Sequence, residues 1–231
     1  MSGFSDTYKQ KLTSPENAVA QVPRKGTLSF TLGPSNPPAL FSALAARVAA
    51  KDIEELHLHY QIAREPAAPL FKAAFLDRLH FHPNFMSELD RKLIKEAGTD
   101  AAVDFVPSYL WQLPAVYTRF NHMNVLMATV SPMDKHGYFS LGTSCDYSSS
   151  VARDCDLLIV EVNRNMPRVF GENILHISEV DFIVENHVPL IELQDRPLIP
   201  EDEDIGKRIA EMVPDGCCSQ DIGTVVTAMQ V

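Results

Sequence analysis

The sequence predicts an α/β fold, with an open, largely parallel sheet flanked by helices on both faces. Residues 156–162, DLLIVEV, form a nearly continuous apolar run, which is typical of a strand buried on both faces. Helical patterns alternate with several such runs, as expected when crossover helices cover a parallel sheet. With 231 residues, 45% of them hydrophobic and 22% charged, the chain can bury a core of its own, and we expect one domain over 1–231.

Strands are expected where β-branched or aromatic runs are bounded by turn residues. In chain order these runs cover residues 27–32, 53–60, 103–107, 125–130, 157–162, and 182–184 together with 190–193. A helix is expected over 37–52, where an apolar stripe follows two prolines. A second helix follows Pro200, because acidic residues fill its first turn and Pro214 and Gly216 lie beyond its end.

Two clusters of turn and capping residues flank the short apolar run 138–141. The first cluster predicts a tight turn, with Pro132 and Asp134 as turn formers and Gly137 free to adopt a positive φ. The residues after this turn would return as a short strand. We therefore expect a hairpin on the rim of the sheet.

The second cluster follows Gly142. Thr143 or Ser144 can cap the N-terminus of a helix whose first turn contains Asp146. The N–H groups of that helix would face the crevice at the carboxyl ends of the strands, where open α/β sheets bind ligands and where an anion is favoured. A carboxylate or an acyl oxygen would fit there. The alternative is that both clusters only build a well-formed rim.

Charge and hydropathy exclude several classes of partner. The formal net charge of -10 argues against nucleic acid, because an acidic surface repels phosphate backbones. The chain has no run of about 18 apolar residues, and its N-terminus lacks the apolar core of a secretory signal. We therefore expect no membrane partner and a cytoplasmic location. The four cysteines lack paired CxxC spacing, so reduced thiols are expected at Cys145, Cys155, Cys217 and Cys218.

Well-marked catalytic motifs are missing from the sequence. It contains no GxSxG, HExxH, GxxxxGKS/T or GxGxxG pattern, which argues against the hydrolases, metalloproteases and nucleotide-binding proteins that these motifs mark. Cys145 lies near the proposed helix start, which could lower the pKa of its thiol. No histidine base is placed beside it, so an unreactive thiol is expected.

Histidines occur two residues apart in two places, His57 with His59 and His80 with His82. On a strand each pair would share a face and could reach one metal ion. Neither pair is accompanied by a convincing third ligand, and half-buried histidines at strand ends are the commoner case. We therefore expect no metal site.

Two charged residues lie near the predicted carboxyl ends of strands. Glu161 stands inside an apolar run, and we expect a paired or partly solvated rim carboxylate rather than a catalytic group. Arg168 lies in a loop bounded by proline and glycine, where its guanidinium could hold a carboxylate by two hydrogen bonds. A solvated loop arginine is the alternative.

Three stretches resemble a known family: residues 104–110, DFVPSYL; residues 131–147, SPMDKHGYFSLGTSCDY; and residues 159–193, which begin IVEVNRNMPRVFGEN. They are similar to the amino-terminal half of the acetyl-CoA hydrolase/transferase family, which includes 4-hydroxybutyrate, butyrate and succinate:acetate CoA-transferases. The resemblance runs from about Leu28 to the C-terminus. It implies a CoA-transferase superfamily domain that pairs with a second domain of comparable size or with a partner subunit.

The resemblance also implies a chemistry and a set of site residues. Coenzyme A would enter as an acyl-CoA substrate, without a metal, and would pass through a glutamyl-CoA thioester to a short acid such as acetate, butyrate, 4-hydroxybutyrate, succinate or itaconate. The family's glutamate follows a Q-x-G-I-G loop and would lie beyond Val231, so no catalytic residue is assigned. Residues 215–231 resemble the start of that loop, in which Asp221 replaces the first glycine and only Gly223 matches as a cofactor-binding residue.

The substrate-facing rim is expected to contain Ser108, Ser131, Asp134, His136, Gly137, Gly142 and Arg168. A homo-oligomer is expected. The alternatives are a non-catalytic fragment or interaction module, and an acyl-CoA hydrolase that would need the same glutamate. A surface that normally meets a second half should expose a large apolar patch.

Overall fold

The computed structural model describes residues 2–144, 146–192, 197–214 and 216. The chain divides into two compact units, Met1–Leu190 and Ile191–Val231. The first unit is the α/β domain, and the second contains helix α7, Pro200–Met212, as expected from its acidic first turn. Within the described residues, no helix has the length and apolar character needed to cross a membrane.

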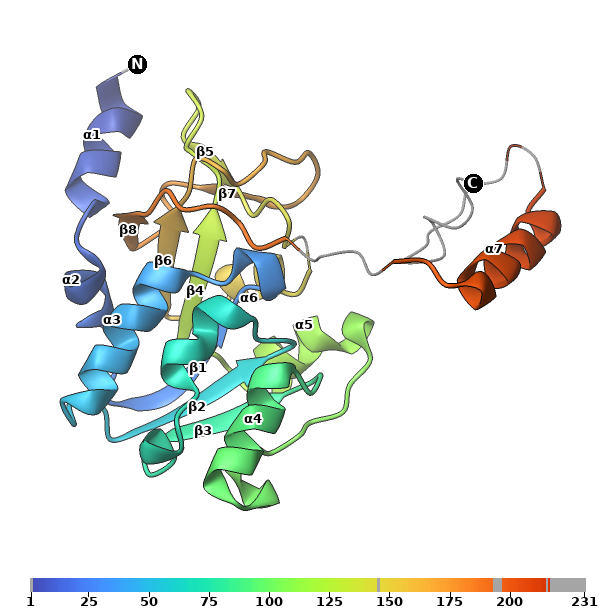
Figure 1. Ribbon diagram of the computed structural model, residues 1–231. Helices are drawn as coiled ribbons and strands as arrows, with labels where there is room; N and C mark the ends of the chain where they lie inside the picture. Colours follow the sequence, from blue (N-terminus) through green and yellow to red (C-terminus); the bar gives the residue numbers. More distant parts are fainter. Residues whose placement is uncertain (1, 145, 193–196, 215, 217–231) are drawn as a thin grey trace. The chain divides into compact units, whose positions relative to one another are not determined.

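Six parallel strands form the main sheet, in the order β3-β2-β1-β4-β6-β8 (Figure 1). The predicted open parallel sheet is therefore confirmed. The strands are β1 (Lys25–Phe30), β2 (Glu55–Tyr60), β3 (Leu79–Pro83), β4 (Val125–Val130), β6 (Leu157–Val162) and β8 (Phe182–Glu185). The two runs that alternate least between apolar and polar residues, β4 and β6, are both interior strands of the sheet, with buried residues on both faces.

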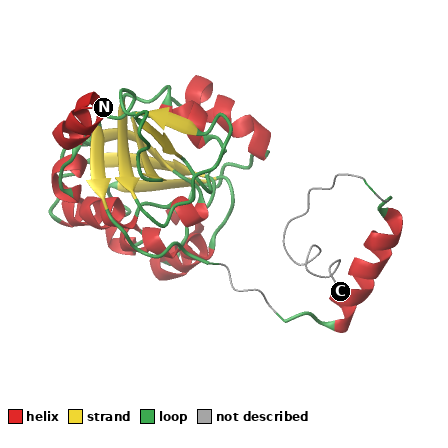
Figure 2. Ribbon diagram, turned by 90° about the horizontal axis from the view of Figure 1, so that it is seen from above, coloured by secondary structure: helices red, strands yellow, loops and turns green. Residues whose placement is uncertain are grey.

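Helices and short helical turns cover both faces of this sheet (Figure 2). The α-helices of the domain are α1 (Ser2–Lys11), α2 (Pro15–Val19), α3 (Pro38–Ala49), α4 (Glu88–Ala97), α5 (Leu113–Ala115) and α6 (Ser148–Ala152). A π-helical turn, Val116–Phe120, follows α5. Short 3-10 turns span Gly33–Ser35, Glu65–Leu70, Ala73–Phe75, Asp100–Ala102 and Leu110–Gln112.

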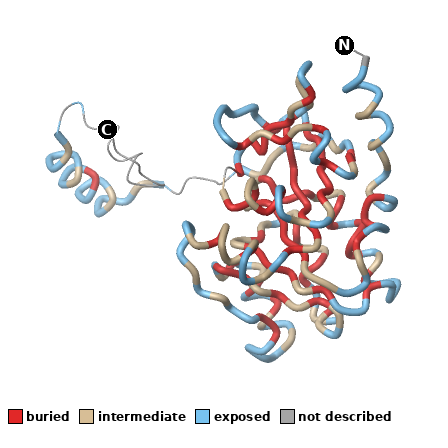
Figure 3. Tube along the Cα trace, turned by 180° about the vertical axis from the view of Figure 1, so that it is seen from behind, coloured by how far each residue is buried: buried red, intermediate tan, exposed pale blue. Residues whose placement is uncertain are grey.

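Two apolar clusters form the core, one on each face of the sheet. The first includes Leu56 and Leu58 of β2 and packs against α2, α3 and α4, while the second includes Leu126 and Val160 and packs against α5 and α6. Neighbouring residues of a strand point to opposite faces, so β4 and β6 each contribute to both clusters. Figure 3 shows these strands as buried tube surrounded by exposed loops.

Several predicted strands and boundaries are wrong. Residues 103–107 form no strand, since only Val103 bridges Phe81, and residues 190–192 are also irregular; residue 193 lies outside the described residues. Strand β3 was not predicted, because its apolar side chains alternate with histidines rather than forming a β-branched run. It is the edge strand, which needs only one apolar face.

The predicted rim hairpin is also corrected. Strand β5, Tyr138–Ser140, pairs antiparallel with β7, Ile174–His176, in a separate two-stranded sheet. Its link to the end of β4 is a single turn, in which Ser131 N–H donates to Ser140 O at 2.8 Å and Asp134 N–H donates to Tyr138 O at 2.9 Å. Residues 141–173 separate β5 from β7, the strand with which it pairs.

The predicted helix start at Thr143 or Ser144 is wrong. Helix α6 begins at Ser148 after Tyr147, and neither hydroxyl caps it. Thr143 Oγ1 instead lies 2.7 Å from Ser35 Oγ, and Ser144 Oγ donates to Leu32 O at 3.1 Å. These hydroxyls tie the loop after β5 to the loop after β1, so the second turn cluster connects loops at the carboxyl edge rather than starting a helix.

Candidate functional site

The carboxyl ends of the parallel strands carry the loops that sequence analysis selected. Asp134 organises the first of them by accepting hydrogen bonds from the N–H groups of His136 at 2.8 Å and Tyr138 at 2.9 Å. Gly137 has a φ of 84°, which confirms the predicted left-handed turn. Partial burial alone would raise the pKa of Asp134, but the N–H groups of Tyr138 and His136 and the charge of Arg168 together lower it.

Arg168 is bound to this turn. Its guanidinium lies 2.6 Å from Asp134 Oδ2 and donates to Tyr138 O at 3.1 Å. Arg168 was expected either to hold a substrate carboxylate or to be solvated. In the structure its guanidinium is neither free for a substrate nor fully solvated. The arginine connects its own loop to the turn after β4.

Gly142 brings the same two loops into direct contact. Its φ is 59°, and a Cβ at this position would collide with the Met166 side chain and lie 2.9 Å from Pro167 O. Ser140 Oγ accepts the N–H groups of Gly142 and Val169, both at 3.1 Å. Residues 131–142 and 166–169 therefore form one packed unit, which we call the rim loops.

The other predicted site residues are more scattered. Ser131 is buried, and its hydroxyl is occupied, because it accepts from Ser140 N–H at 2.9 Å and donates to Pro132 O at 3.1 Å. His136 is exposed on the turn. Ser108 lines a separate pocket with Pro107, Tyr109 and Gln112. Gly223 lies outside the described residues, as does Cys145. Whether any of these residues touches a substrate stays a prediction.

A pocket of about 560 Å³ lies at the carboxyl ends of β4, β6 and β8, and none of the residues that line it was predicted as a site residue. Arg164 and His187 line it, and α1 contributes Tyr8, whose hydroxyl donates to Glu185 at 2.7 Å. Within the described part of the chain, the Arg164 guanidinium makes no hydrogen bond or ion pair, which leaves its positive charge free. The position of Arg164, two residues after a predicted central strand, is the sequence signal that could have identified it.

Glu161 is fully buried near the same edge of the sheet, so the expectation of a partly solvated carboxylate is wrong while that of a paired one is right. Glu161 Oε2 accepts the N–H groups of Ala39 and Leu40, in the first turn of α3, at 3.0 and 3.1 Å. Asn186 donates to Oε1 at 2.7 Å. Burial raises the pKa of Glu161 to about 7 even though these donors oppose the shift. The carboxyl group joins α3, β6 and the end of β8.

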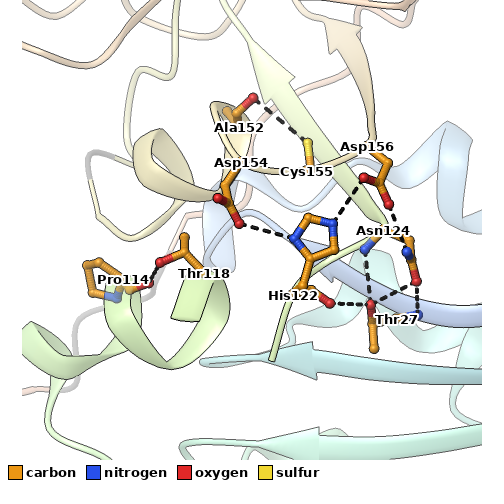
Figure 4. Close-up of polar contacts among 9 residues, drawn as sticks. All are labelled: Thr27, Pro114, Thr118, His122, Asn124, Ala152, Asp154, Cys155 and Asp156. Carbon is orange, nitrogen blue, oxygen red and sulfur yellow. Dashed lines mark hydrogen bonds and ion pairs between the residues drawn. The ribbon is translucent and has the colours of Figure 1, made fainter. Parts of the chain in front are cut away.

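A second polar cluster lies at the opposite edge, before β4 and β6 (Figure 4). His122 Nδ1 lies 3.2 Å from Asp154 and its Nε2 lies 3.0 Å from Asp156, and the hydrogen bond to Asp156 is the largest of the effects that raise the pKa of His122. Asn124 donates to Asp156 at 2.8 Å and accepts from Thr27 N–H at 3.0 Å. These contacts connect the amino ends of three strands, where parallel sheets carry stabilising rather than catalytic groups.

The Cys155 thiol lies close to this cluster and donates to Ala152 O (Figure 4). Burial raises the pKa of Cys155 to about 12. A thiol with this pKa remains protonated at neutral pH and is a poor nucleophile. The prediction of a reduced thiol therefore holds for Cys155.

Comparison with known proteins identifies the relatives of this chain. Residues 3–192 match the family described as acetyl-CoA hydrolase/transferase N-terminal domain. A succinyl-CoA:cyclohexane-1-carboxylate CoA transferase from Geobacter metallireducens is 33% identical, over 94% of this chain and 48% of its own length. A butyryl-CoA:acetate CoA-transferase from Anaerostipes caccae gives the same three values, 33%, 94% and 48%. The chain thus spans about half the length of the curated relatives it matches.

Solved structures agree with the fold. The crystal structure of RipA from Yersinia pestis superposes with a TM-score of 0.93 at 42% identity, covering 97% of this chain and 53% of RipA. A 4-hydroxybutyrate CoA-transferase from Porphyromonas gingivalis, 23% identical, shares the fold with a TM-score of 0.77 over 98% of this chain and 52% of its own. Both the motifs and the sheet topology lead to the same conclusion: this chain belongs to the acetyl-CoA hydrolase/transferase family, and it corresponds to the amino-terminal domain.

Proposed function

We propose that this domain forms the acid-binding side of a CoA-transferase active site. In the net reaction, an acyl-CoA and a free carboxylate exchange the CoA group, so that one thioester is broken and one is formed. A glutamate from a second half would attack the acyl-CoA and carry CoA as a glutamyl thioester until the acceptor acid takes it. Such covalent catalysis divides one difficult transfer into two easier ones. The acceptor would be acetate, butyrate, 4-hydroxybutyrate, succinate, itaconate or a similar short acid.

The single observation that carries this proposal is the family match over residues 3–192, combined with a pocket at the carboxyl ends of the strands that Arg164 lines together with Glu185 and His187. An α/β sheet binds its ligands at that edge. Arg164 supplies a free guanidinium there, and a planar guanidinium can hold a carboxylate by two hydrogen bonds. Arg168, in contrast, already binds Asp134.

A second half of comparable size would complete the site, because this chain covers only 48% of the length of its transferase relatives. Exposed apolar side chains that could meet such a partner come from one segment of the domain. Tyr109 is 73%, Trp111 77% and Phe120 78% exposed, and Phe105 and Leu110 are exposed as well. Exposed aromatic residues in this number are typical of a protein interface. A cytoplasmic homo-oligomer belongs to the same proposal.

Two alternatives remain distinct from transfer. An acyl-CoA hydrolase would accept the same acyl-CoA substrate but would pass the acyl group to water. A non-catalytic interaction module would bind its partner through the aromatic segment and turn nothing over. The free Arg164 in the pocket favours transfer, because a hydrolase needs no acceptor carboxylate.

The proposal can be tested with a hybrid enzyme. In the hybrid, residues 3–192 replace the matching half of the Anaerostipes caccae butyryl-CoA:acetate CoA-transferase, and CoA exchange is measured between acetyl-CoA and a panel of isotopically labelled short acids. We expect exchange by the hybrid and none by the isolated 231-residue chain. The unmodified transferase is the positive control.

Three outcomes would contradict the proposal. Exchange by the isolated chain would show that its nucleophile lies within the chain. A hybrid that is folded by circular dichroism but inactive would favour an interaction module. Release of free CoA without transfer to any acid would favour a hydrolase.

The role of Arg164 gives a second prediction. In the active hybrid, Arg164→Gln should raise KM for the acceptor acid by about 10- to 100-fold with little change in kcat, since one charge-assisted contact contributes about 1.5–3 kcal/mol. Its midpoint of thermal unfolding should stay nearly unchanged, because within the described residues the guanidinium makes no hydrogen bond or ion pair.

Arg168→Gln is the matched control for this prediction. It removes the contacts to Asp134 and Tyr138, so it should lower the thermal midpoint by about 2–4 °C while affecting KM less. Steady-state kinetics and thermal melts on both variants separate the two roles. An unchanged KM in Arg164→Gln would exclude this pocket as the acid site.

A further inference from the structure

Four histidines form a ladder on one face of strands β2 and β3. Parallel pairing places His57 opposite His80 and His59 opposite His82. The rings of His57 and His80 stack with centroids 4.7 Å apart, and those of His59 and His82 with centroids 4.5 Å apart. Because side chains two residues apart share a face, Glu55 extends the same row toward the amino end of β2.

This face of β2 and β3 is left open by the core. Among the described residues, the apolar cluster on that side of the sheet contains no residue of either strand. The π-helical turn covers one end of the ladder, where the Tyr117 ring contacts His59. At the other end the His57 side chain keeps 38% of its surface exposed. An ion in solution can therefore reach the end formed by Glu55, His57 and His80.

Three potential ligand atoms converge at this open end. Glu55, His57 and His80 each offer one such atom, and these atoms all lie within 4.8 Å of one another. Glu55 Oε1 lies 3.7 Å from His57 Nε2. Zinc bonds to nitrogen and oxygen are about 2.0–2.2 Å long, which places two ligands of one ion about 3–4 Å apart. Small side-chain rotations on two fixed strands are enough to reach this geometry.

One hydrogen bond and one carboxylate behind His57 set its ring for this purpose. Asp104 Oδ2 lies 3.7 Å from His82 Nδ1, so the carboxylate favours a proton on that nitrogen. With its proton on Nδ1, His82 would accept through Nε2 the proton of His57 Nδ1, which lies 2.9 Å away. The lone pair of His57 is left on Nε2, facing the Glu55 carboxylate. Two electron-rich atoms that face each other favour a cation between them.

We propose that Glu55, His57 and His80 bind a divalent transition-metal ion of the zinc class, with His82 and Asp104 as positioning residues for His57. Two imidazoles and one carboxylate suit Zn²⁺ better than Mg²⁺ or Ca²⁺, which prefer oxygen ligands throughout. The sequence-based expectation of no metal site lacked a third ligand, and Glu55 supplies it. The ion would clamp the edge strand β3 to β2, on a part of the sheet that the rim loops do not use.

The test uses the 231-residue chain without an affinity tag. Zn²⁺ binding is measured by calorimetry, and Co²⁺ is used as a visible reporter of the ligand geometry. We expect one equivalent to bind. Glu55→Gln, His57→Gln and His80→Gln should each weaken binding at least about 100-fold. Asp104→Asn should weaken it about 10-fold, because Asp104 acts only by orienting His82 and, through it, the ligand His57.

Two variants serve as matched controls, one for the carboxylate ligand and one for the histidine ligands. Glu54→Gln removes an exposed carboxylate that pairs with Arg24 and Lys25 instead, and His136→Gln removes an exposed histidine on the distant turn. Both variants should bind the ion like the parent chain. Circular dichroism without metal checks that every variant is folded, and Glu55→Gln is the variant least able to disturb folding because its side chain is 48% exposed.

Thermal melts give an independent readout. Zn²⁺ at about 100 times its Kd should raise the melting midpoint by about 5–10 °C in the parent chain and not in Glu55→Gln. The proposal is overturned if the parent chain binds no stoichiometric Zn²⁺, or if binding and stabilisation survive all three ligand substitutions. In either case the ladder would be a stack of histidines without an ion.

Discussion

Replacing Gly142 by alanine is expected to lower the free energy of unfolding by about 3 kcal/mol. The glycine adopts a φ of 59°, a conformation that costs a residue with a Cβ about 1–2 kcal/mol. The new Cβ would also collide with the Met166 side chain and lie 2.9 Å from Pro167 O. The methionine can rotate away, but a backbone carbonyl can move only by separating the rim loops.

Gly98 provides a matched control for this prediction. It has a similar φ of 69° at the C-terminus of α4, yet a Cβ there would meet nothing within 4 Å. Gly98→Ala should therefore cost only about 1 kcal/mol, the conformational part alone. Urea unfolding of both variants measures the difference. Equal losses of stability would show that the rim loops are not packed as tightly as the structure indicates.

The stability of the chain should fall as the pH rises through neutrality, because of Glu161. Its pKa rises from 4.5 to about 7 on folding, so between these values the folded state holds a proton that the unfolded state has lost. The stabilisation from this proton is complete below pH 4.5 and is lost as the pH passes about 7. Between pH 5 and pH 8 the loss should be about 2–3 kcal/mol.

Glu161→Gln tests this prediction because glutamine does not titrate. Its amide oxygen can still accept the N–H groups of α3, and Asn186 can turn its own oxygen toward the new amide. The difference in unfolding free energy between the parent chain and the variant, measured in urea at both pH values, isolates this one group. A difference that stays constant with pH would mean that Glu161 is ionised in the folded state at pH 5.

Asn186→Ala extends the same test in the opposite direction. The Asn186 amide is the strongest of the hydrogen-bond donors that lower the pKa of Glu161 and oppose the effect of burial. Without it the pKa of Glu161 should rise further, and the loss of stability should begin at a higher pH. A shift to lower pH would contradict the assigned role of Asn186.

Local sequence patterns predicted the central part of the sheet well. Strands β4 and β6 begin and end at the predicted residues, because continuous apolar runs bounded by turn residues leave few alternatives. The predicted helix over 37–52 contains α3, and the positive φ of Gly137 follows from its place in a tight turn. These features depend on residues that are neighbours in the chain.

Features that depend on distant residues were predicted less well. The partner of β5 is β7, which a local hairpin pattern cannot reveal. Arg168 was predicted either to hold a substrate carboxylate or to be solvated, but its partner Asp134 lies 34 positions away in the sequence. Arg164 was overlooked because a free guanidinium is recognised only when every neighbouring group is known. Helix α6 begins later than predicted because the hydroxyls of Thr143 and Ser144 bind the loop after β1.

The sequence by itself determined the fold class, the central strands and the family, since these follow from apolar periodicity and from motifs that are contiguous in the chain. Only the tertiary structure decided how the loops at the carboxyl edge are connected and that Glu161 is buried beneath α3. It alone also shows that Glu55 lies close to both His57 of β2 and His80 of β3. The physical reason is that hydrogen bonds and ion pairs act over a few ångströms in space. Parallel pairing brings together residues that local patterns treat as unrelated.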